Sequence, residues 1–532
     1  MSRASATGVA RRLGDCYEAH SDGPALRWGE RWFSFAEVAA IAAGIAARLQ
    51  DAGAQPGDRV VVHLETSPLA RAVDHALLGH GFVRVALSSR LHPHEVAAIA
   101  ADAEAAIVIC EAARADELRA AIASVPCRPR IVTFDDGDAT PSRLLGAATP
   151  APLLPRAADD PLMLMYSSGT TGTPKGVIVT DATWLAQLDR ALAQLPPITR
   201  DDVVVLAAPM AHFGGSIGLD CMMRGARTVV VDPFEPHRVL DAIQRHRGTV
   251  VPLVPTLLGR LVDALPGRDD AVASVRAVPY GGSPVPAELL LRAARYFPRS
   301  LVQFYGLAEA LAPLTTLSPD DHRRAARRLA GAPDDAAARA RLQSAGRWTP
   351  GIEHRIVDDE LQVRGDTVMP GYWRRDELTA SALKDGWFRT GDLGETDADG
   401  YLHLRGRRSE LIISGGFNVH PREVEQVIER LPGIAEVAVL GLPDERWGEA
   451  VHAFVVLEPA GSADDPPMHP DDLARAVREA CLARIASYKK PVGIHVLLAI
   501  PRNSFGKVDR AAIRARFGSA DDRTPTPPAE RR

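Results

Sequence analysis

The spacing of hydrophobic and polar positions predicts alternating helices and strands in the first third of the chain. Residues 34–50 have the period of an amphipathic helix, and residues 56–63 indicate a turn that leads into a buried strand. The alternation continues as a helix at 94–104, a strand at 106–110, a helix at 113–124 and a strand at 130–134. Because strands that alternate with helices form parallel sheets covered by helices, this pattern predicts an α/β fold.

The middle of the chain repeats the pattern and then changes character. Strands are predicted at 203–207, 227–231 and 249–254, with helices between them. Residues 319–345 are rich in Asp, Arg and Ala and predict a solvated helical excursion. Short strands and turns dominate from 351 to 408, which predicts a β-rich subdomain.

The last part of the chain predicts a smaller α+β unit. It has a helix at 421–431 and strands near 436–441 and 450–457, and the polar, Pro-rich residues 459–470 predict a loop. The end of the chain lacks apolar anchors and is expected to be disordered. We therefore predict a large N-terminal domain at 1–408, a small mobile C-terminal domain at 409–517 and a disordered tail at 518–532.

Length and composition limit the class of protein. A chain of 532 residues exceeds what one hydrophobic core supports, which predicts at least two domains. A net charge of −5 gives no argument for nucleic acid or an anionic membrane as a partner. The five scattered cysteines form no CxxC pair, the N-terminus lacks a signal-peptide core, and no apolar run is long enough to span a bilayer. We expect a reduced, cytoplasmic enzyme of unknown oligomeric state, with no membrane insertion.

One short run stands out because the protein rarely uses lysine. Of 62 basic residues only five are lysines, and Lys175 ends the run Tyr-Ser-Ser-Gly-Thr-Thr-Gly-Thr-Pro-Lys that begins at Tyr166. A lysine among Gly, Ser and Thr indicates a need for a compact ammonium, and glycines let backbone N–H groups face an anion. The run predicts a phosphate-holding loop. It lacks the pattern of the nucleoside triphosphatase loop, and its rival interpretation is an ordinary turn between strands.

Five further motifs follow in order. Tyr280–Pro286 is a Gly-rich turn that enters a helix, and Gln303–Glu309 places an aromatic, a glycine and a carboxylate within seven residues. Gly386–Gly394 places an acid, Asp392, in a tight turn. The run Arg405–Val424 joins the two domains, and Pro501–Lys507 ends on another of the rare lysines.

With six motifs in this order and spacing, the whole chain resembles the superfamily of adenylate-forming enzymes. That superfamily comprises acyl-CoA synthetases, adenylation domains of peptide synthetases and luciferases, and the pattern is most similar to that of acid–CoA ligases. The resemblance implies that residues 1–408 form an AMP-binding domain. It also implies two half-reactions, in which a carboxylate attacks ATP to give an acyl-adenylate and a thiol of CoA or of carrier-protein pantetheine then displaces AMP.

The resemblance also implies roles for named residues. Loop 167–175 would hold the β- and γ-phosphates, Glu309 with Thr170 or Thr171 would hold Mg²⁺, and Tyr305 would stack on adenine. Asp392 would accept the ribose hydroxyls with help from Arg407, and Lys507 would reach the α-phosphate and carboxylate. The expected catalytic residues are Lys507, Lys175, Glu309 and Thr170. The expected nucleotide-binding residues are Ser167, Ser168, Gly169, Thr170, Thr171, Gly172, Lys175, Gly281, Gly282, Ser283, Gln303, Phe304, Tyr305, Gly306, Asp392, Arg407 and Lys507.

The acid pocket and the domain movement are also implied by the resemblance. His212, Phe213, Gly281 and Leu307 would bind the acid, and Ser409 would be the hinge of the mobile domain. Rotation about that hinge would open a channel for the thiol. Residues 210–219 contain no acidic residue that could pair with an α-amino group, which counts against amino-acid activation. The rival interpretation of His212 is an interior histidine with satisfied hydrogen bonds.

Each of the other residues also has a structural rival. Tyr305 could be a core residue, Asp392 a turn cap, Glu309 a solvated acid at a helix start, and Lys507 an exposed loop lysine. One position departs from the family pattern, since Ala308 stands where relatives carry a threonine whose hydroxyl holds the α-phosphate.

We expect a medium-chain, cyclic or aromatic acid as substrate and CoA as acceptor. Support for CoA comes from residues 414–416 and 486–491, the latter with two of the five lysines. The first alternative is a stand-alone biosynthetic enzyme that passes its adenylate to a carrier protein or an amine, including a diazotase-like enzyme that activates nitrite. A non-catalytic nucleotide-binding homologue is the remaining alternative.

Overall fold

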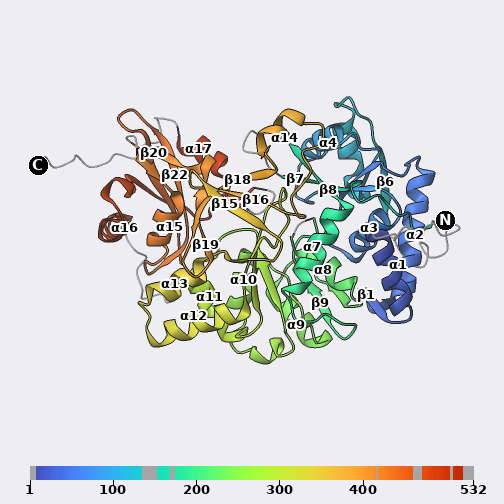
Figure 1. Cartoon of the computed structure of the whole chain (residues 1–532), viewed down its shortest axis with the longest axis horizontal. Helices are drawn as coiled ribbons and strands as arrows, with labels where there is room; N and C mark the ends of the chain where they lie inside the picture. The colour runs from blue at the N-terminus through green and yellow to red at the C-terminus, as the bar shows by residue number, and fades with distance from the viewer. Residues whose placement is uncertain are drawn as a thin grey trace, which may run out of the picture. The chain divides into compact units, whose positions relative to one another are not determined.

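The computed structural model describes residues 8–134, 152–167, 174–211, 213–414, 417–458, 470–503 and 507–518. The chain divides into two compact units. The large unit comprises Met1–Arg355, Gln362–Thr390 and Thr396–His403, and the small unit comprises Ile356–Leu361, Gly391–Glu395 and Leu404–Arg532. This division falls inside strands β15, β16, β18 and β19, and the predicted boundary at 408 stays a prediction. Figure 1 labels the elements of both units.

The first sheet of the large unit has six strands in the order β6-β5-β3-β4-β7-β8, parallel except for the antiparallel pair β7–β8. Successive residues of β3 show why both faces are covered. Val60 and Val62 pack in a core with the first three helices, whereas Val61 packs with α4 and α5 on the other face. The elements here are α1 (Val9–His20), α2 (Phe35–Asp51), β3 (Arg59–His63), α3 (Pro68–Gly79), β4 (Val83–Ala86), α4 (Pro93–Asp102), β5 (Ile107–Glu111), α5 (Ala115–Ile122), β6 (Arg130–Phe134), β7 (Pro161–Ser167), β8 (Lys175–Thr180) and α7 (Asp181–Ala193).

The second sheet has four strands in the order β2-β1-β10-β9, with β1, β10 and β9 parallel. The predicted strand at 249–254 is wrong as a continuous strand, since only isolated bridges at Val250 and Leu253 form there. Pro252 and Pro255 explain this, because proline has no N–H to donate to a ladder. The elements are β1 (Pro24–Trp28), β2 (Arg31–Ser34), β9 (Val203–Leu206), α8 (Phe213–Met222), β10 (Arg227–Val230), α9 (Pro236–His246) and α10 (Pro255–Asp263).

A third sheet begins with the parallel pair β11–β12 and continues antiparallel through β13, β14 and β19. The helical region predicted at 319–345 consists of α12 and α13, but some of its side chains are buried and not exposed to solvent. Ala325 and Leu329 are buried in the core, and the His322 ring lies 2.6 Å from the Tyr280 hydroxyl. The elements are β11 (Val278–Gly281), α11 (Ala287–Tyr296), β12 (Leu301–Tyr305), β13 (Thr315–Leu317), α12 (Pro319–Gly331), α13 (Ala336–Gln343) and β14 (Gly346–Trp348).

The predicted β-rich region consists of short strands, with Asp392 inside one of them. The prediction that Asp392 lies in a tight turn is wrong, because β18 runs without a break through Gly391 and Asp392. Gly391 takes a φ of 72° within the strand, a conformation that glycine adopts without strain. The elements are β15 (Glu353–Val357), β16 (Glu360–Arg364), α14 (Asp376–Ala382), β17 (Leu383–Lys384), β18 (Trp387–Thr396) and β19 (Tyr401–Arg407).

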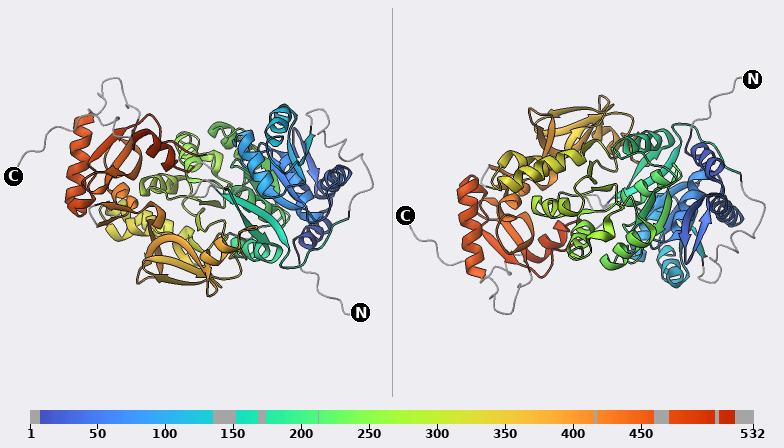
Figure 2. Two further views of the ribbon diagram at one scale, coloured as in Figure 1. Left: turned by 90° about the horizontal axis from the view of Figure 1, so that it is seen from above. Right: turned by 90° about the horizontal axis from the view of Figure 1, so that it is seen from below.

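The rest of the small unit is a sheet between helices. Side chains alternate along β22, so that Val439 packs with α15 and α16 whereas Leu440 packs with α17. Figure 2 shows α16 and α17 on opposite sides of this sheet. The elements are β20 (Ile412–Ser414), β21 (Phe417–Val419), α15 (Pro421–Ile428), β22 (Ile434–Asp444), β23 (Gly448–Leu457), α16 (Pro470–Arg484), β24 (Gly493–Val496) and α17 (Arg510–Phe517).

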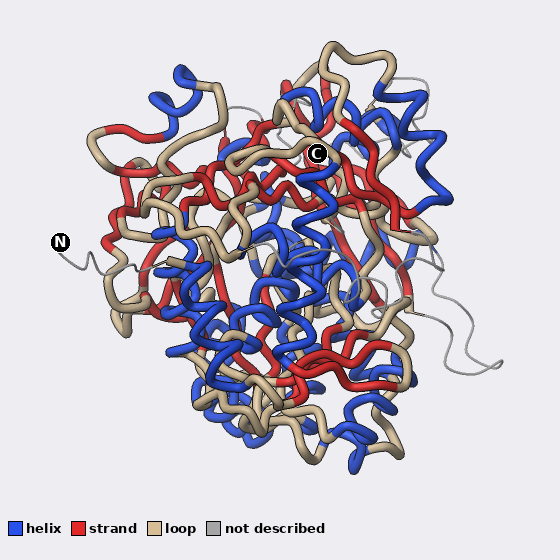
Figure 3. The backbone as a smooth tube through the Cα atoms, turned by 90° about the vertical axis from the view of Figure 1, so that its right-hand side faces the viewer, coloured by secondary structure: helices blue, strands red, loops and turns tan. Residues whose placement is uncertain are grey.

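The predicted fold class is confirmed, with mixed α/β sheets and helices in the large unit and a small α+β unit after it. Figure 3 shows helices and strands alternating along the backbone. Residues 459–469 of the loop predicted at 459–470, and residues 519–532 of the tail predicted at 518–532, lie outside the described residues. Within the described ranges, no helix is both long and apolar enough to cross a membrane.

Candidate active site

A lysine, a glutamate and a tyrosine meet in the large unit. The Lys175 Nζ lies 3.0 Å from the Glu309 Oε1 and donates to the Tyr372 hydroxyl, also at 3.0 Å. The Tyr372 hydroxyl donates in turn to the same Glu309 oxygen at 3.0 Å, and the ammonium lies 4.4 Å from the centre of the tyrosine ring. We call these three residues the Lys–Glu–Tyr cluster. It joins two residues that the sequence predicts for phosphate and metal binding.

The strands around the cluster bring these distant residues together. β7 ends at Ser167 and β8 begins at Lys175, and the two residues are paired in register. Tyr372 lies beside β8 through a bridge with Val177 and a hydrogen bond from the Trp373 N–H to the Gly176 carbonyl. Lys175 therefore stands at the mouth of the β7–β8 connection, where the phosphate loop is predicted.

The electrostatics of the cluster favour an ionised carboxylate. Burial alone would raise the pKa of Glu309, but the Lys175 ammonium and the hydrogen bonds from Lys175 and Tyr372 outweigh burial and lower it. A carboxylate held ionised by a cation and a phenol can exchange those partners for a hard cation, which prefers oxygen ligands. Glu309 lies in neither a helix start nor an exposed position, so the rival interpretation of a solvated helix-start acid is wrong.

The ends of β11 and β12 lie side by side as parallel neighbours, with Gly281 paired to Phe304. A Cβ at Gly281 would lie 2.3 Å from the Phe304 carbonyl oxygen, so this close approach requires glycine. Gly282 and Ser283 are exposed just beyond it, which leaves their backbone open to a ligand. Tyr305 ends β12 and is partly buried, whereas the Phe304 side chain is buried in the core. A ligand contact by Phe304 would therefore use its backbone.

Three residues of the predicted acid pocket are described: Gly281 at the end of β11, Phe213 and Leu307. The Phe213 ring, at the start of α8, meets Phe304 edge-on with centroids 5.9 Å apart. The Leu307 N–H donates to the Ala310 carbonyl in a turn after Gly306. Tyr280, the first residue of the Gly-rich motif, is fully buried, and its hydroxyl lies 2.6 Å from the His322 Nε2 and 3.4 Å from the Gln303 Oε1. Tyr280 thus belongs to the core in this structure.

In the small unit, Asp392 and Arg407 form an ion pair, with the Arg407 Nε 2.9 Å from the Asp392 Oδ1. The sequence assigned both residues to the ribose, and the structure brings them together. Asp392 is 5% exposed, whereas the Arg407 side chain is 41% exposed. Because Asp392 lies within β18, it does not cap a turn.

The remaining predicted residues of the small unit occupy short connections. Ser409 lies in a 3₁₀ turn at Arg408–Glu410. Arg408 donates to the Asp358 carbonyl, and Glu410 pairs with Arg510 at 3.2 Å. Lys507 is exposed, and its backbone N–H donates to the Asn503 side chain at 3.1 Å.

Six predicted residues lie outside the described residues, so the structure gives no account of them: Ser168, Gly169, Thr170, Thr171, Gly172 and His212. Tyr372 is the residue that sequence reasoning missed. It lies in the region 351–408, which the sequence predicted only as short strands and turns. Lys175 and Tyr372 are separated by 197 positions in the chain, so no local pattern indicated their contact.

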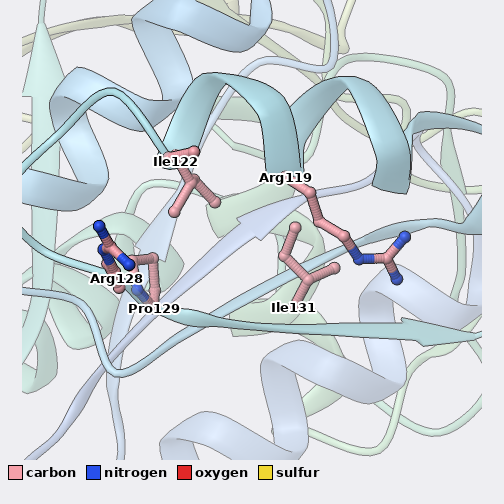
Figure 4. A pocket seen from close by; sticks show the side chains of 6 residues that line it. Arg119, Ile122, Arg128, Pro129 and Ile131 are labelled. Carbon is pink, nitrogen blue, oxygen red and sulfur yellow. The ribbon is translucent and has the colours of Figure 1, made fainter.

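Two hollows on the large unit are separate from this site. One has a volume of 240 Å³ and lies between α5 and β6, lined by Arg119, Ile122 and Ile131 among others (Figure 4). The other has a volume of 490 Å³ and is lined by arginines such as Arg227 and Arg276. Neither contains a predicted site residue. The described residues also contain no group of three or more His, Cys, Asp or Glu side chains arranged to hold a metal ion.

Comparison with known proteins identifies the family of the chain. Residues 15–373 match the AMP-binding enzyme family, and residues 423–507 match the AMP-binding enzyme C-terminal domain. The chain belongs to the AMP-binding enzyme family, which confirms the resemblance drawn from the motifs.

Individual relatives cover nearly the whole chain. A feruloyl-CoA synthase of Amycolatopsis sp is 33% identical over 500 residues, which is 93% of this chain and 96% of the relative. The crystal structure of ATP-bound MatB from Rhodopseudomonas palustris is 27% identical with a TM-score of 0.83, covering 96% of this chain and 99% of that one. The amide bond synthetase McbA from Marinactinospora thermotolerans is 29% identical with a TM-score of 0.81, covering 96% and 100%.

Proposed function

We propose that this protein is an ATP-dependent acid–CoA ligase that forms an acyl-adenylate and transfers the acyl group to CoA. The observation that carries the proposal is the Lys–Glu–Tyr cluster. In this cluster a rare lysine at the end of the predicted phosphate loop contacts an ionised glutamate. Family membership and the similarity to a feruloyl-CoA synthase support the ligase activity. The substrate class that we propose is a medium-chain, cyclic or aromatic carboxylic acid.

In the first half-reaction, a carboxylate oxygen attacks the α-phosphorus of ATP. The bond from that phosphorus to the bridging oxygen breaks, and pyrophosphate leaves. Lys175 would bind the β- and γ-phosphates, because an ammonium has three N–H donors and can donate to a phosphate oxygen without losing both of its present partners. Lys507 would neutralise the charge that develops between the α-phosphate and the carboxylate.

Glu309 and Thr170 are the residues that we propose for Mg²⁺. The carboxylate of Glu309 fits this ion because it is ionised and is an oxygen donor. When bound, Mg²⁺ would neutralise charge on the departing pyrophosphate. Tyr372 would hold both Glu309 and Lys175 in place, and the pair Asp392–Arg407 would bind the ribose hydroxyls.

In the second half-reaction, the thiol sulfur of CoA attacks the carbonyl carbon, the thiol loses its proton and AMP leaves. The proposed thiol surface lies in the small unit, around the predicted CoA segment 486–491. There the exposed rings of Phe417 and Tyr488 stack with centroids 4.6 Å apart, and Lys489 pairs with Glu423. An aromatic face beside lysines suits a nucleotide with phosphate groups. We also propose that the enzyme is cytoplasmic and acts in a biosynthetic pathway.

Mass spectrometry of complete reactions tests this function. The protein would be incubated with ATP, Mg²⁺ and a panel of carboxylic acids, each with and without CoA. We expect one class of acid to give an acyl-CoA product together with AMP. No acid-dependent AMP from any member of the panel would refute the proposal.

A second candidate passes the adenylate to an amine or a carrier protein. It is favoured by the similarity to the amide bond synthetase McbA over the whole chain. The same assay separates the two, since AMP formation that needs an acid but gives no CoA product identifies this candidate. Parallel reactions with an amine, and with nitrite plus an aryl amine, would identify amide formation or a diazotase-like reaction.

A further inference from the structure

Four charged side chains are buried in the large unit next to the segment 210–215. Arg71 and Asp74 lie on α3, Arg84 lies on β4 and Asp220 lies on α8, with exposed fractions of 0%, 3%, 9% and 0%. Removing charges from water costs free energy that an ion pair only partly returns, and apolar residues often stabilise a core as well. Stability alone therefore does not explain why these four charged side chains are buried together.

The contacts of the two arginines give that reason. The Arg84 Nε donates to the Asp74 Oδ1 at 2.6 Å, and the Arg71 Nη1 donates to the Asp74 Oδ2 at 3.4 Å. Each guanidinium then donates to a backbone carbonyl, Arg84 to Met210 at 3.3 Å and Arg71 to Gly215 at 3.0 Å. Asp74 thus joins two guanidinium groups, and these hold the two ends of one short segment. We call Arg71, Asp74 and Arg84 the backbone clamp.

The clamped segment turns sharply. A Cβ at Gly215 would lie 2.0 Å from the Met210 carbonyl oxygen, so only glycine permits this approach of the two ends. Asp220 follows on the same helix and is the second buried carboxylate beside Arg71. Burial raises the pKa of Asp220 to about 7, against the hydrogen bond from Gln187 and the charge of Arg71. The clamp therefore fixes a backbone conformation that the apolar core alone would not specify.

The clamped segment contains Phe213. This residue begins α8 between the two held carbonyls, and its ring packs edge-on against Phe304. Phe304 directly precedes Tyr305, the residue predicted to stack on adenine. The segment thus lies next to the predicted nucleotide motif, and it contains Phe213, a residue predicted to bind the acid.

We infer that Arg71, Asp74 and Arg84 are positioning residues for the carboxylic acid substrate, which hold the wall of its pocket through the Met210 and Gly215 carbonyls. The inference rests on the proposed function. Guanidinium groups suit the task because they have several donors in a fixed planar arrangement, so one group can bind a carboxylate and a carbonyl together. An apolar residue of equal volume would fill the space without directing the carbonyls.

Acid-dependent ATP–pyrophosphate exchange tests the clamp. Arg84→Met removes the bond to Met210 and leaves Asp74 paired with Arg71. We expect its KM for the acid to rise about 10-fold because a misplaced pocket wall weakens positioning, with the KM for ATP changed less than about 2-fold. Arg84→Lys keeps the charge but offers a single point of contact, and we expect a smaller rise in the same KM.

The matched control is Asp202→Asn. Asp202 is 1% exposed and pairs with Arg276 at 2.7 Å, away from the clamped segment. Thermal unfolding of all variants gives the loss of stability, and the control is expected to lose stability without a change in either KM. If Arg84→Met raised the KM for the acid and the KM for ATP equally, the proposed role of the clamp in positioning the acid would be wrong. The same rise in the KM for the acid in Asp202→Asn would also contradict it. Exchange that is absent from the unmodified protein for every acid would instead refute the proposed function.

Discussion

Lys175 and Lys507 are two of only five lysines, and the two units hold them differently. In the large unit the Lys175 ammonium lies 3.0 Å from both Glu309 and Tyr372, and its side chain is 24% exposed. In the small unit Lys507 is exposed on a short connection, where its backbone N–H donates to the Asn503 side chain and its carbonyl accepts from the Asn503 N–H. The Lys175 ammonium is therefore partly buried against two polar side chains, whereas Lys507 is an exposed residue of the small unit.

This difference indicates two kinds of task. A preorganised cation loses little freedom when it binds an anion, which suits a site that holds ATP phosphates through the reaction. An exposed lysine on a separate unit suits a group that is brought to the substrate for one step only. The predictions that follow test whether the two lysines and the residues around them divide the work in this way.

Lys507→Ala should have the largest effect. We expect adenylate formation to fall at least about 100-fold, since removing one donor to a charge that develops in the transition state costs this much in other enzymes. A supplied acyl-adenylate should still be consumed with CoA, because the second half-reaction does not need this ammonium. The measurement is exchange of labelled pyrophosphate into ATP, alongside acyl-CoA formation from the adenylate. Unimpaired exchange in this variant would show that Lys507 does not take part in adenylate formation.

Glu309→Gln should come next. The amide keeps the shape of the side chain but loses the charge that pairs with Lys175, and we expect exchange to fall about 100-fold. The concentration of Mg²⁺ needed for half-maximal rate should rise as well. Glu353→Gln is the control, because Glu353 pairs with Arg364 on the surface and should not affect either quantity. An unchanged Mg²⁺ requirement would count against Glu309 as a metal ligand.

Tyr372→Phe should give a moderate effect. The change removes the hydroxyl that bonds both Lys175 and Glu309 but keeps the ring under the ammonium. Hydrogen bonds to charged groups contribute about 1.5–3 kcal/mol, so we expect kcat/KM for ATP to fall about 10-fold or more. Tyr401→Phe also removes a hydroxyl–carboxylate bond, to Asp321 at 2.7 Å, and serves as the control. Equal effects of the two changes would mean that Tyr372 only stabilises the fold.

Ala308→Thr should have the smallest effect and the opposite sign. A hydroxyl at this position would add one hydrogen bond to the α-phosphate, worth about 0.5–1.5 kcal/mol. Binding of a stable acyl-adenylate analogue, measured by calorimetry, should tighten about 2- to 10-fold. Weaker or unchanged binding would show that the site has compensated for the missing threonine in another way.

Local sequence pattern predicted much of the fold. The helix at 34–50 has a serine cap and a capping box at Ser34 and Glu37, and the strand at 130–134 was predicted with its observed bounds. The prediction of a strand at 249–254 was wrong because it rested on the apolar run and ignored Pro252 within the run and Pro255 directly after it. Asp392 was expected in a turn because Gly391 looked like a turn residue, although it lies within β18.

The candidate site was less accessible to sequence reasoning. Motifs gave Lys175, Glu309 and Asp392, because their residue types are set by the chemistry of phosphate, metal and ribose. They did not give Tyr372 or the backbone clamp, whose members act through contacts between distant segments. The contact of Arg71 with Gly215 spans 144 residues, and no local pattern records it. Long-range positioning is the part of a site that only the fold reveals.

The central claim is that a carboxylate oxygen attacks ATP to form an acyl-adenylate. The most direct test uses an accepted acid labelled with ¹⁸O in its carboxyl group, with ATP, Mg²⁺ and CoA. Because the attacking oxygen leaves with AMP when the thiol takes the acyl group, the account predicts AMP that carries one ¹⁸O atom. Unlabelled AMP from a reaction that consumes the acid would contradict it.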